Sequence, residues 1–442
     1  MRDANALEIS AGAIATAHYD AAIEHLLRFQ PAVVDRASAM TQADPGAPMG
    51  YVLQAYLGLL SSEWPDALAA GEQIRALRAH APTRNAREQG HLEAIEIWLK
   101  GDWLGAARTL AGLSATYPDD TLALFVGHQL DFFTGAARAL CERVGGALLV
   151  RDATHPHHSF LTGMHAFGLE ESGQYREAEA LGRAAIERHP EDVWALHAVA
   201  HVCEMTGQTD AGLALYAQCG EAWLENNFLS VHNAWHRALF LLEREDYAGV
   251  LAGYDRHLNH AESPGIALEL LDASALLWRL RLDGIDPGER WAPLAEAWAR
   301  KDPRPWYAFN DVHAVMAFIG AGRLADARSV AARLEAYAAT PTADETNAMM
   351  TARVGLPVAR GLLAHGEQRY ADVVAALWPV RESLALFGGS HAQRDAIQRT
   401  LLDALQRAGQ HEAARDLLNQ RLADRPDSRW AHARVSQLGG GR

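Results

Sequence analysis

Apolar residues recur every three or four positions along almost the whole chain, and glycines separate the apolar segments at regular intervals. This spacing places the apolar side chains on one face of an α-helix, so it predicts helices. Alternating runs of valine, isoleucine and threonine, which would indicate strands, are nearly absent. The pattern therefore predicts an all-α protein.

Residues 159–192 indicate how the predicted helices are paired. The segment SFLTGMHAFGLEESGQYREAEALGRAAIERHPED has small residues at packing positions, a glycine at the turn, an aromatic residue that opens the second helix and a closing proline: Ala166, Ala178, Ala185, Gly173, Tyr175 and Pro190. This is the layout of a tetratricopeptide unit, in which two antiparallel helices occupy about 34 residues. The same skeleton recurs in AIEIWLKGDWLGAARTLAGLSATYP, ALFLLEREDYAGVLAGYDRHL, VMAFIGAGRLADARSVAARLEAY, GLLAHGEQRYADVVAALW and LLDALQRAGQHEAARDLLNQRLADRP.

Stacked units of this kind predict a tetratricopeptide-type helix-pair solenoid, curled into a superhelix with a concave groove. At about 34 residues a unit, residues 1–442 have room for roughly 12–13 helix pairs in a single domain. The stretches RAHAPTRNAREQG and YAATPTADETNAMMTARVG are predicted to be insertions, and the glycine-rich C-terminus is expected to fray.

Composition and charge limit the classes of partner. The chain is 49% hydrophobic and 21% charged, as folded proteins are, and its formal net charge is -15. Nucleic acids and anionic membranes require a basic surface, so neither is expected as a partner. The chain begins without a signal-peptide pattern, has no apolar run of about 18 residues, and has three cysteines without metal-type spacing. We therefore expect a cytoplasmic protein with a small-molecule ligand, and the sequence leaves a homo-oligomer open.

The histidines of the chain point to a more specific kind of site. There are 21 of them, and several are spaced by one helical turn. In WALHAVAHVCEM, His197, His201 and Glu204 follow each other at steps of four and three residues, so they share one helix face. SVHNAWHRALF repeats the spacing with His232 and His236.

The repeat register places these residues on the same side of successive units. If one unit starts at residue 159, the next starts at 193 and a later one at 231, and the histidine pairs then fall on the first helix of their units. In tetratricopeptide units the first helix lines the concave groove, which is not the packed core. The register therefore predicts that both pairs line one groove, and that His201 adds little to apolar burial and to stability.

Two chemistries suit such a groove. Imidazoles from neighbouring helices are ligands for zinc, iron or manganese, and the predicted metal ligands are His197, His201, His232 and His236. Without a metal, a histidine oriented by a carboxylate can carry a proton, and the catalytic candidates are His201, Glu204, Glu170, His128, Asp131 and His313. The predicted substrate-binding residues are Trp235, Asn233, Asp272 and Arg279.

One of these assignments excludes a known motif, and two leave alternatives open. His197 is followed by Ala198 rather than by glutamate, so the pair is not the motif of a zinc protease. His128 and Asp131 fall on a packing face in the simple register, so either that unit is shifted or they form a buried pair. Arg279 either holds an anion in the groove or extends from the helix flank into solvent, and the flank interpretation is favoured.

Residues 165–216, beginning HAFGLEESGQYREAEAL, together with HNAWHRALFLLEREDYAGVLAGYD, resemble the tetratricopeptide repeat protein 38 family. HQLDFFTG, DASALLWRLRLDG and FNDVHAVMAF are further matches, and the resemblance extends over roughly residues 10–430. Its most specific elements, His-xxx-His-xx-Glu and His-Asn-x-Trp-His, are both intact, whereas Cys203 stands where similar sequences often have an aliphatic residue. The resemblance implies the helix-pair fold and its groove, and it implies no particular reaction.

Two classes of function follow from these residues. Peptide-binding grooves of this fold usually present lysine, arginine and asparagine, whereas the predicted groove presents imidazole, carboxylate and tryptophan. We therefore expect a small-molecule enzyme site that uses either a metal or His/Glu acid–base chemistry. The alternative is a non-catalytic scaffold that binds a peptide or a partner protein, as most tetratricopeptide proteins do.

Overall fold

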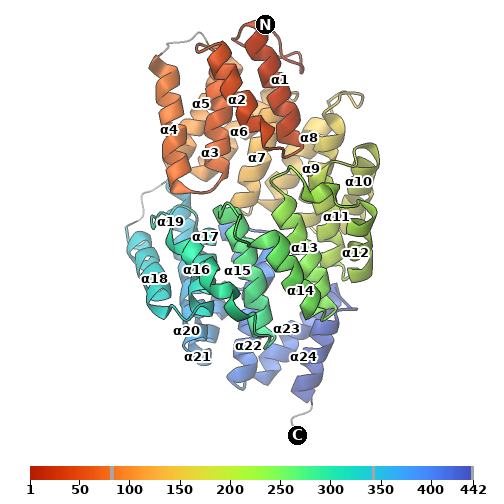
Figure 1. Cartoon of the computed structure of the whole chain (residues 1–442), viewed down its shortest axis with the longest axis vertical. Coiled ribbons are helices and arrows are strands. Elements are labelled where there is room, and N and C mark those ends of the chain that lie inside the picture. The colour runs from red at the N-terminus through yellow and green to blue at the C-terminus, as the bar shows by residue number, and fades with distance from the viewer. Residues whose placement is uncertain (80–83, 341–343, 440–442) are drawn as a thin grey trace. The chain divides into compact units, whose positions relative to one another are not determined.

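The computed structural model describes residues 1–79, 84–340 and 344–439 (Figure 1). These residues form helices and no strand, with one isolated bridge between Arg2 and Glu8. The predicted all-α fold is therefore confirmed. The terminus predicted to fray, from residue 440 on, lies outside the described residues, as do residues 80–83 and 341–343 of the two predicted insertions. No helix in the described ranges is long and apolar enough to cross a membrane.

The chain divides into two compact units. Unit 1 comprises Met1–Val199, Ala222–Ser230 and Ala343–Asn347, and unit 2 comprises Ala200–Glu221, Val231–Thr342 and Ala348–Arg442. The boundary falls within the helix that carries His197 and His201, so it assigns His197 to unit 1 and His201 to unit 2. The single domain over residues 1–442 stays a prediction.

Unit 1 is a series of helix pairs in which each helix packs on the next one in the chain. The helices are α1 (Ala13–Leu27), α2 (Ala32–Ala43), α3 (Pro48–Leu60), α4 (Trp64–Ala79), α5 (Ala86–Leu99), α6 (Trp103–Thr116), α7 (Thr121–Phe133), α8 (Ala137–Leu148), α9 (His158–Glu171) and α10 (Tyr175–Arg188). The pair α9–α10 is the unit predicted from residues 159–192. Gly173 has a φ of +76° at its turn, a conformation that glycine adopts without strain. The tetratricopeptide-type pairing is therefore confirmed.

Unit 2 continues the helical pattern with irregular interruptions. Its helices are the end of α11 (Val193–Met205), α12 (Thr209–Gln218), α13 (Ser230–Glu243) from its second residue on, α14 (Tyr247–Gly253), α15 (Ala267–Leu282), α16 (Trp291–Ala299), α17 (Ala308–Gly320), α18 (Leu324–Ala338), the end of α19 (Thr346–Met350), α20 (Leu356–Gly366), α21 (Tyr370–Leu377), α22 (His391–Arg407), α23 (His411–Asp424) and α24 (Arg429–Gly439). π-helical turns follow α14 at Tyr254–Leu258 and α19 at Thr351–Gly355. Short 3-10 turns occupy Gly288–Arg290, Trp378–Val380 and Leu384–Phe387, and another, Ala222–Leu224, belongs to unit 1.

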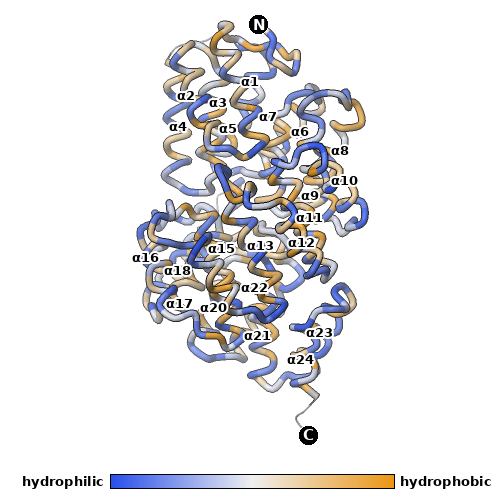
Figure 2. The backbone as a smooth tube through the Cα atoms, turned by 45° about the vertical axis from the view of Figure 1, so that its right-hand side comes forward, coloured by the Kyte–Doolittle hydropathy of each residue, from blue (hydrophilic) through white to orange (hydrophobic). Residues whose placement is uncertain are grey.

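Small residues set how closely the helices approach each other. At Gly212 of α12, a Cβ atom would lie 2.3 Å from the ring of Phe240 on α13, so only glycine fits there. Hydrophobic and hydrophilic residues mix along the helices (Figure 2), and the apolar faces include fully buried aromatic side chains such as Trp235 and Trp278. This is the packing that the periodicity of the sequence predicts.

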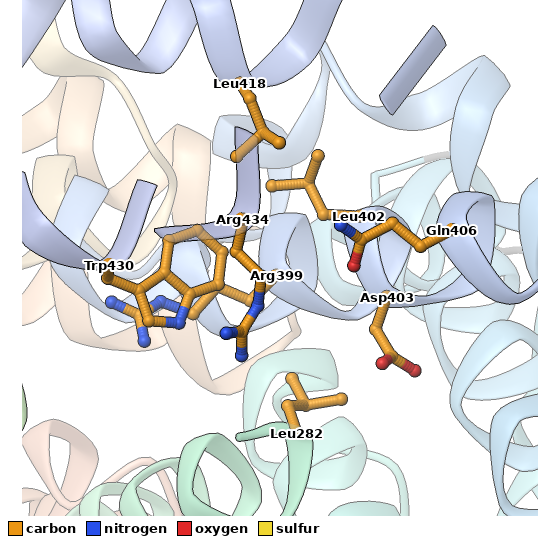
Figure 3. A pocket seen from close by; sticks show the side chains of 8 residues that line it. All are labelled: Leu282, Arg399, Leu402, Asp403, Gln406, Leu418, Trp430 and Arg434. Carbon is orange, nitrogen blue, oxygen red and sulfur yellow. The ribbon is translucent and has the colours of Figure 1, made fainter. Parts of the chain in front are cut away.

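The C-terminal helix pair, α23 and α24, packs through a small apolar cluster and an ionic network. Leu402, Leu418 and Trp430 form the apolar part. The guanidinium groups of Arg399 and Arg434 lie 4.2 and 5.0 Å from the ring centre of Trp430 (Figure 3). Cation–π contacts and charge therefore supply much of the contact of this pair with α22.

Candidate metal centre

Three of the predicted ligands, His201, His232 and His236, lie together in unit 2. One candidate ligand atom from each lies within 4.8 Å of those of the others. The ring centres of His201 and His236 are 4.3 Å apart, and those of His232 and His236 are 4.8 Å apart. His201 comes from α11 and the other two come from one face of α13, as their i, i+4 spacing requires.

Two of these histidines are oriented by carboxylates. Nδ1 of His232 lies 2.7 Å from Oδ2 of Asp272 on α15, and Nδ1 of His236 lies 3.2 Å from Oε2 of Glu204 on α11. When Nδ1–H donates to a carboxylate, Nε2 carries the lone pair that a metal ion needs. Glu204 was predicted to be catalytic and Asp272 to bind substrate, and the structure places both behind the imidazoles as hydrogen-bond acceptors.

Gln393, which was not among the predicted site residues, extends this series of hydrogen bonds. Nε2 of Gln393 donates to Oδ1 of Asp272 at 3.4 Å, and Gln393 also forms the capping box of α22 with Ser390. Gln393 follows Asp272 by 121 positions, and no spacing rule links residues so far apart. Only its place in the cap, three residues after a serine, is visible in the sequence.

His197, the fourth predicted ligand, lies at the end of unit 1 on α11. It precedes His201 by four residues, so helical geometry gives the two side chains the same face. Within unit 1 its ring centre is 5.0 Å from those of Trp194 and Phe167. Its role as a ligand stays a prediction.

The neighbourhood of the three histidines is buried rather than an open groove. His201 and His236 have exposed fractions of 0%, and the side chain of His232 is 16% exposed. Trp235 is also fully buried, and its ring stacks on His232 with centres 5.4 Å apart. The expectation that His201 adds little to burial is therefore wrong, because neighbouring aromatic and helical residues cover this face.

Asn233 and Arg279, both predicted to bind substrate, are buried in unit 2. Oδ1 of Asn233 accepts a hydrogen bond from the hydroxyl of Tyr216 at 3.1 Å. Arg279 is 1% exposed, so the interpretation that it extends from the helix flank into solvent is wrong. Its guanidinium carbon lies 5.3 Å from the ring centre of Trp235, and burial lowers the pKa of Arg279 to about 10. A buried guanidinium beside the histidines needs a counter-charge.

His313, predicted to be catalytic, lies on α17 of unit 2. Its Nδ1 donates to the backbone carbonyl of Phe309 at 2.7 Å. Burial lowers the pKa of His313 to about 4, and the charge of Asp272 opposes that shift in part. His313 is therefore a neutral imidazole at pH 7, and its Nδ1–H is engaged in the hydrogen bond to the backbone.

The remaining catalytic candidates, His128, Asp131 and Glu170, are buried in unit 1. Asp131 forms a two-pronged ion pair with Arg143, at 2.6 and 2.9 Å, so the alternative in which His128 and Asp131 pair with each other is wrong. Burial next to Arg143 lowers the pKa of His128 to about 3, and burial raises the pKa of Asp131. The structure thus divides the predicted catalytic set between the two units.

Comparison with known proteins finds no matching family model and two distant structural similarities. No protein-family model matches the chain. The chain resembles a structure of Naa15/Naa10 bound to HypK-THB, with 11% identity, a TM-score of 0.26, and coverage of 96% of this chain and 65% of that chain. It also resembles the crystal structure of the APC/C hetero-tetramer Cut9–Hcn1, with 13% identity, a TM-score of 0.28, and coverage of 96% and 88%.

Scores this low carry no argument about function, and the first of these chains is matched over less than two thirds of its length. The class of the protein follows from its own helices instead. Consecutive antiparallel helix pairs with glycine turns define an all-α helical-repeat protein of the tetratricopeptide type.

Proposed function

We propose that this chain is a metal-binding helical-repeat protein in which His201, His232 and His236 hold one divalent ion. The observation that carries the proposal is the pair of buried carboxylates behind the imidazoles, at 2.7 Å from His232 and 3.2 Å from His236. Metal-bound histidines almost always donate their other ring nitrogen to such a partner. Packing alone does not require three imidazoles in contact.

Zinc suits this donor set better than iron or manganese. Three neutral ring nitrogens are typical zinc ligands, whereas manganese prefers oxygen and non-haem iron usually takes a carboxylate as a direct ligand. Zinc–nitrogen distances of about 2.0–2.1 Å place tetrahedral ligand atoms roughly 3.3 Å apart. The candidate atoms lie within 4.8 Å of one another, so small rotations of the rings bring them onto one ion.

The proposed activity is chemistry on a small molecule. In zinc enzymes three protein ligands leave one position for water or substrate, and the bound metal supplies Lewis-acid chemistry. Asp272 and Glu204 hold the imidazoles in place, and the burial of the cluster excludes bulk water.

Within this proposal the chain is a relative of the tetratricopeptide repeat protein 38 family. The two most specific elements of the resemblance carry the residues that meet in the cluster. His-xxx-His-xx-Glu supplies His201 and Glu204, and His-Asn-x-Trp-His supplies His232, Trp235 and His236.

The second candidate is a scaffold that binds a partner protein, and one observation besides the fold favours it. A hollow of about 720 Å³ lies between the end of α15 and the start of α16, where Pro287, Trp291 and Pro293 line it. Aromatic side chains such as tryptophan are common in surfaces that bind peptides. A scaffold would require no metal.

A zinc titration of the protein, purified without a histidine tag and stripped with chelator, tests the proposal. We expect one zinc per chain, and His236→Gln should weaken zinc binding at least 10-fold because it removes a ligand. His365→Gln is the matched control, since His365 is also held by a carboxylate, Asp403, at 2.8 Å. Equal zinc affinity in wild type and His236→Gln would refute the metal centre. Peptide binding that the chelator leaves unchanged would then favour the scaffold.

A further inference from the structure

A small cavity of about 20 Å³ adjoins the histidine cluster, and arginines line it. Arg279, Arg399 and Arg425 supply the positive charge, and Glu204, Glu243 and Asp395 supply the negative charge. Glu204 links the cavity to the cluster, because its other contact is the hydrogen bond from His236. All these residues belong to unit 2.

Each carboxylate in the lining already has donors. Glu243 accepts hydrogen bonds from the hydroxyl of Ser428 at 2.8 Å and from the backbone N–H of Trp430 at 3.2 Å. Asp395 accepts from Nε of Arg399 at 2.9 Å and from Arg421. The negative charges of the lining are therefore engaged within the protein.

Two of the arginines lack an equivalent partner. The guanidinium of Arg279 donates to the backbone carbonyls of Ala392 at 2.6 Å and Ala275 at 3.1 Å, and its nearest carboxylate, Asp395, is 4.0 Å away. Nη2 of Arg425 donates to the sulfur of Met205 at 2.7 Å, and no ion pair of Arg425 occurs within the described part of the chain. Arg279 is buried and Arg425 is half-buried, and a guanidinium in such surroundings without a matched carboxylate favours an external anion. Burial lowers the pKa of Arg279 to about 10, and the charge of Asp395 opposes that shift only in part.

A neighbouring hollow shows what a balanced arrangement looks like. Arg399 also lines a hollow of about 10 Å³ together with Arg434, Asp403 and Trp430 (Figure 3). There Arg434 pairs with Asp283 at 2.6 Å, and Nε1 of Trp430 donates to the same carboxylate at 2.8 Å. Cation and carboxylate are matched at that position, so it attracts no further anion.

We propose that the cavity binds a compact anionic group, a carboxylate or a phosphate, between Arg279 and Arg425. A volume of about 20 Å³ admits one or two water-sized groups, so only the anionic end of a ligand fits. Arginine is the side chain best suited to such groups, because its planar fork can donate two parallel hydrogen bonds.

The position of the cavity indicates which class of substrate the proposed enzyme would bind. The anion would lie on one side of Glu204 and the histidines on the other, so a small organic acid or phosphate ester could be anchored next to the metal. This part of the inference rests on the proposed function. Anion binding itself requires no metal.

The test is calorimetric titration of chelator-treated protein with acetate and with inorganic phosphate at constant ionic strength, with chloride as the background salt. We expect saturable binding of at least one of the two anions, weakened at least 10-fold in Arg425→Gln. Arg425 is half-buried, so this variant should fold even if Arg279→Gln does not. Arg407→Gln is the control, because Arg407 is 52% exposed and already paired with Asp403. It should bind like wild type.

Two outcomes would overturn the anion site. One is the absence of saturable binding of either anion, and the other is equal affinity in wild type and Arg425→Gln. Preference for acetate or for phosphate distinguishes a carboxylate ligand from a phosphate ligand. Because zinc is absent, a negative result refutes the anion site and leaves the metal centre to the zinc titration.

Discussion

Replacing Asp272 by asparagine removes one negative charge behind the proposed metal ligands while keeping the size of the side chain. Asp272 is 1% exposed, and its Oδ2 lies 2.7 Å from Nδ1 of His232. An asparagine oxygen can still accept that hydrogen bond, so His232 should keep its place. The variant therefore tests the electrostatic support of the imidazole rather than its position.

The size of the effect follows from the role of such partners. Loss of a carboxylate that holds a metal-bound histidine costs about 10–100-fold in metal affinity, or roughly 1.4–2.7 kcal/mol. We expect a loss in this range for Asp272→Asn, because the carboxylate is buried and its charge is poorly screened. Stability of the metal-free protein should change less, since the shape and one acceptor are retained.

Competition between the protein and a zinc-binding dye measures this difference. Asp403→Asn is the matched control, because Asp403 holds His365 at 2.8 Å in the same unit but outside the cluster. Zinc affinity should fall in Asp272→Asn and stay at the wild-type value in Asp403→Asn. An unchanged affinity in Asp272→Asn, or the same loss in both variants, would refute the reasoning.

Three further predictions concern the fold. Burial raises the pKa of Asp192 from 3.8 to about 7, so the folded state holds a proton that the unfolded state releases, and stability is lost as pH rises from about 4 to 7. Asp192→Asn keeps the oxygen that caps α11. In thermal melts its free energy of unfolding should rise relative to that of wild type by up to about 4 kcal/mol between pH 4 and pH 7. A difference that does not depend on pH would contradict this. Asp131→Ala leaves the buried Arg143 unpaired and should cost about 3–5 kcal/mol in urea unfolding, whereas a loss under about 1 kcal/mol would argue against that pair. Gly212→Ala should cost about 1–3 kcal/mol because its Cβ meets a phenylalanine ring, while Gly112→Ala, with open space around it, should be neutral or stabilising.

Much of the local fold could be predicted from the sequence, because helix pairing depends on short-range patterns. Gly173 and Tyr175 fall at the turn and at the start of α10, as the repeat skeleton of residues 159–192 predicts. The π-helical turn at Tyr254–Leu258 and the division of α11 between two units have no counterpart in the repeat skeleton. Periodicity carries no signal for such features.

The candidate site, too, could be predicted only where it depends on short-range spacing. The shared helix face of His232 and His236 follows from their spacing, and so does the place of Glu204 one turn after His201. The partner of Asp131 was missed because Arg143 lies on the next helix, and the repeat register does not specify ion pairs. The burial of His201 and Arg279 could not be predicted from the sequence. The repeat register gives the direction in which a side chain points, but it does not show which residues cover that side chain.

Zinc K-edge X-ray absorption of the protein loaded with one equivalent of zinc tests the central claim most directly. The account predicts nitrogen or oxygen scatterers at about 2.0–2.1 Å, with outer-shell scattering from at least three imidazole rings for each zinc. Cysteine sulfur at about 2.3 Å, or oxygen ligands without imidazole scattering, would contradict it.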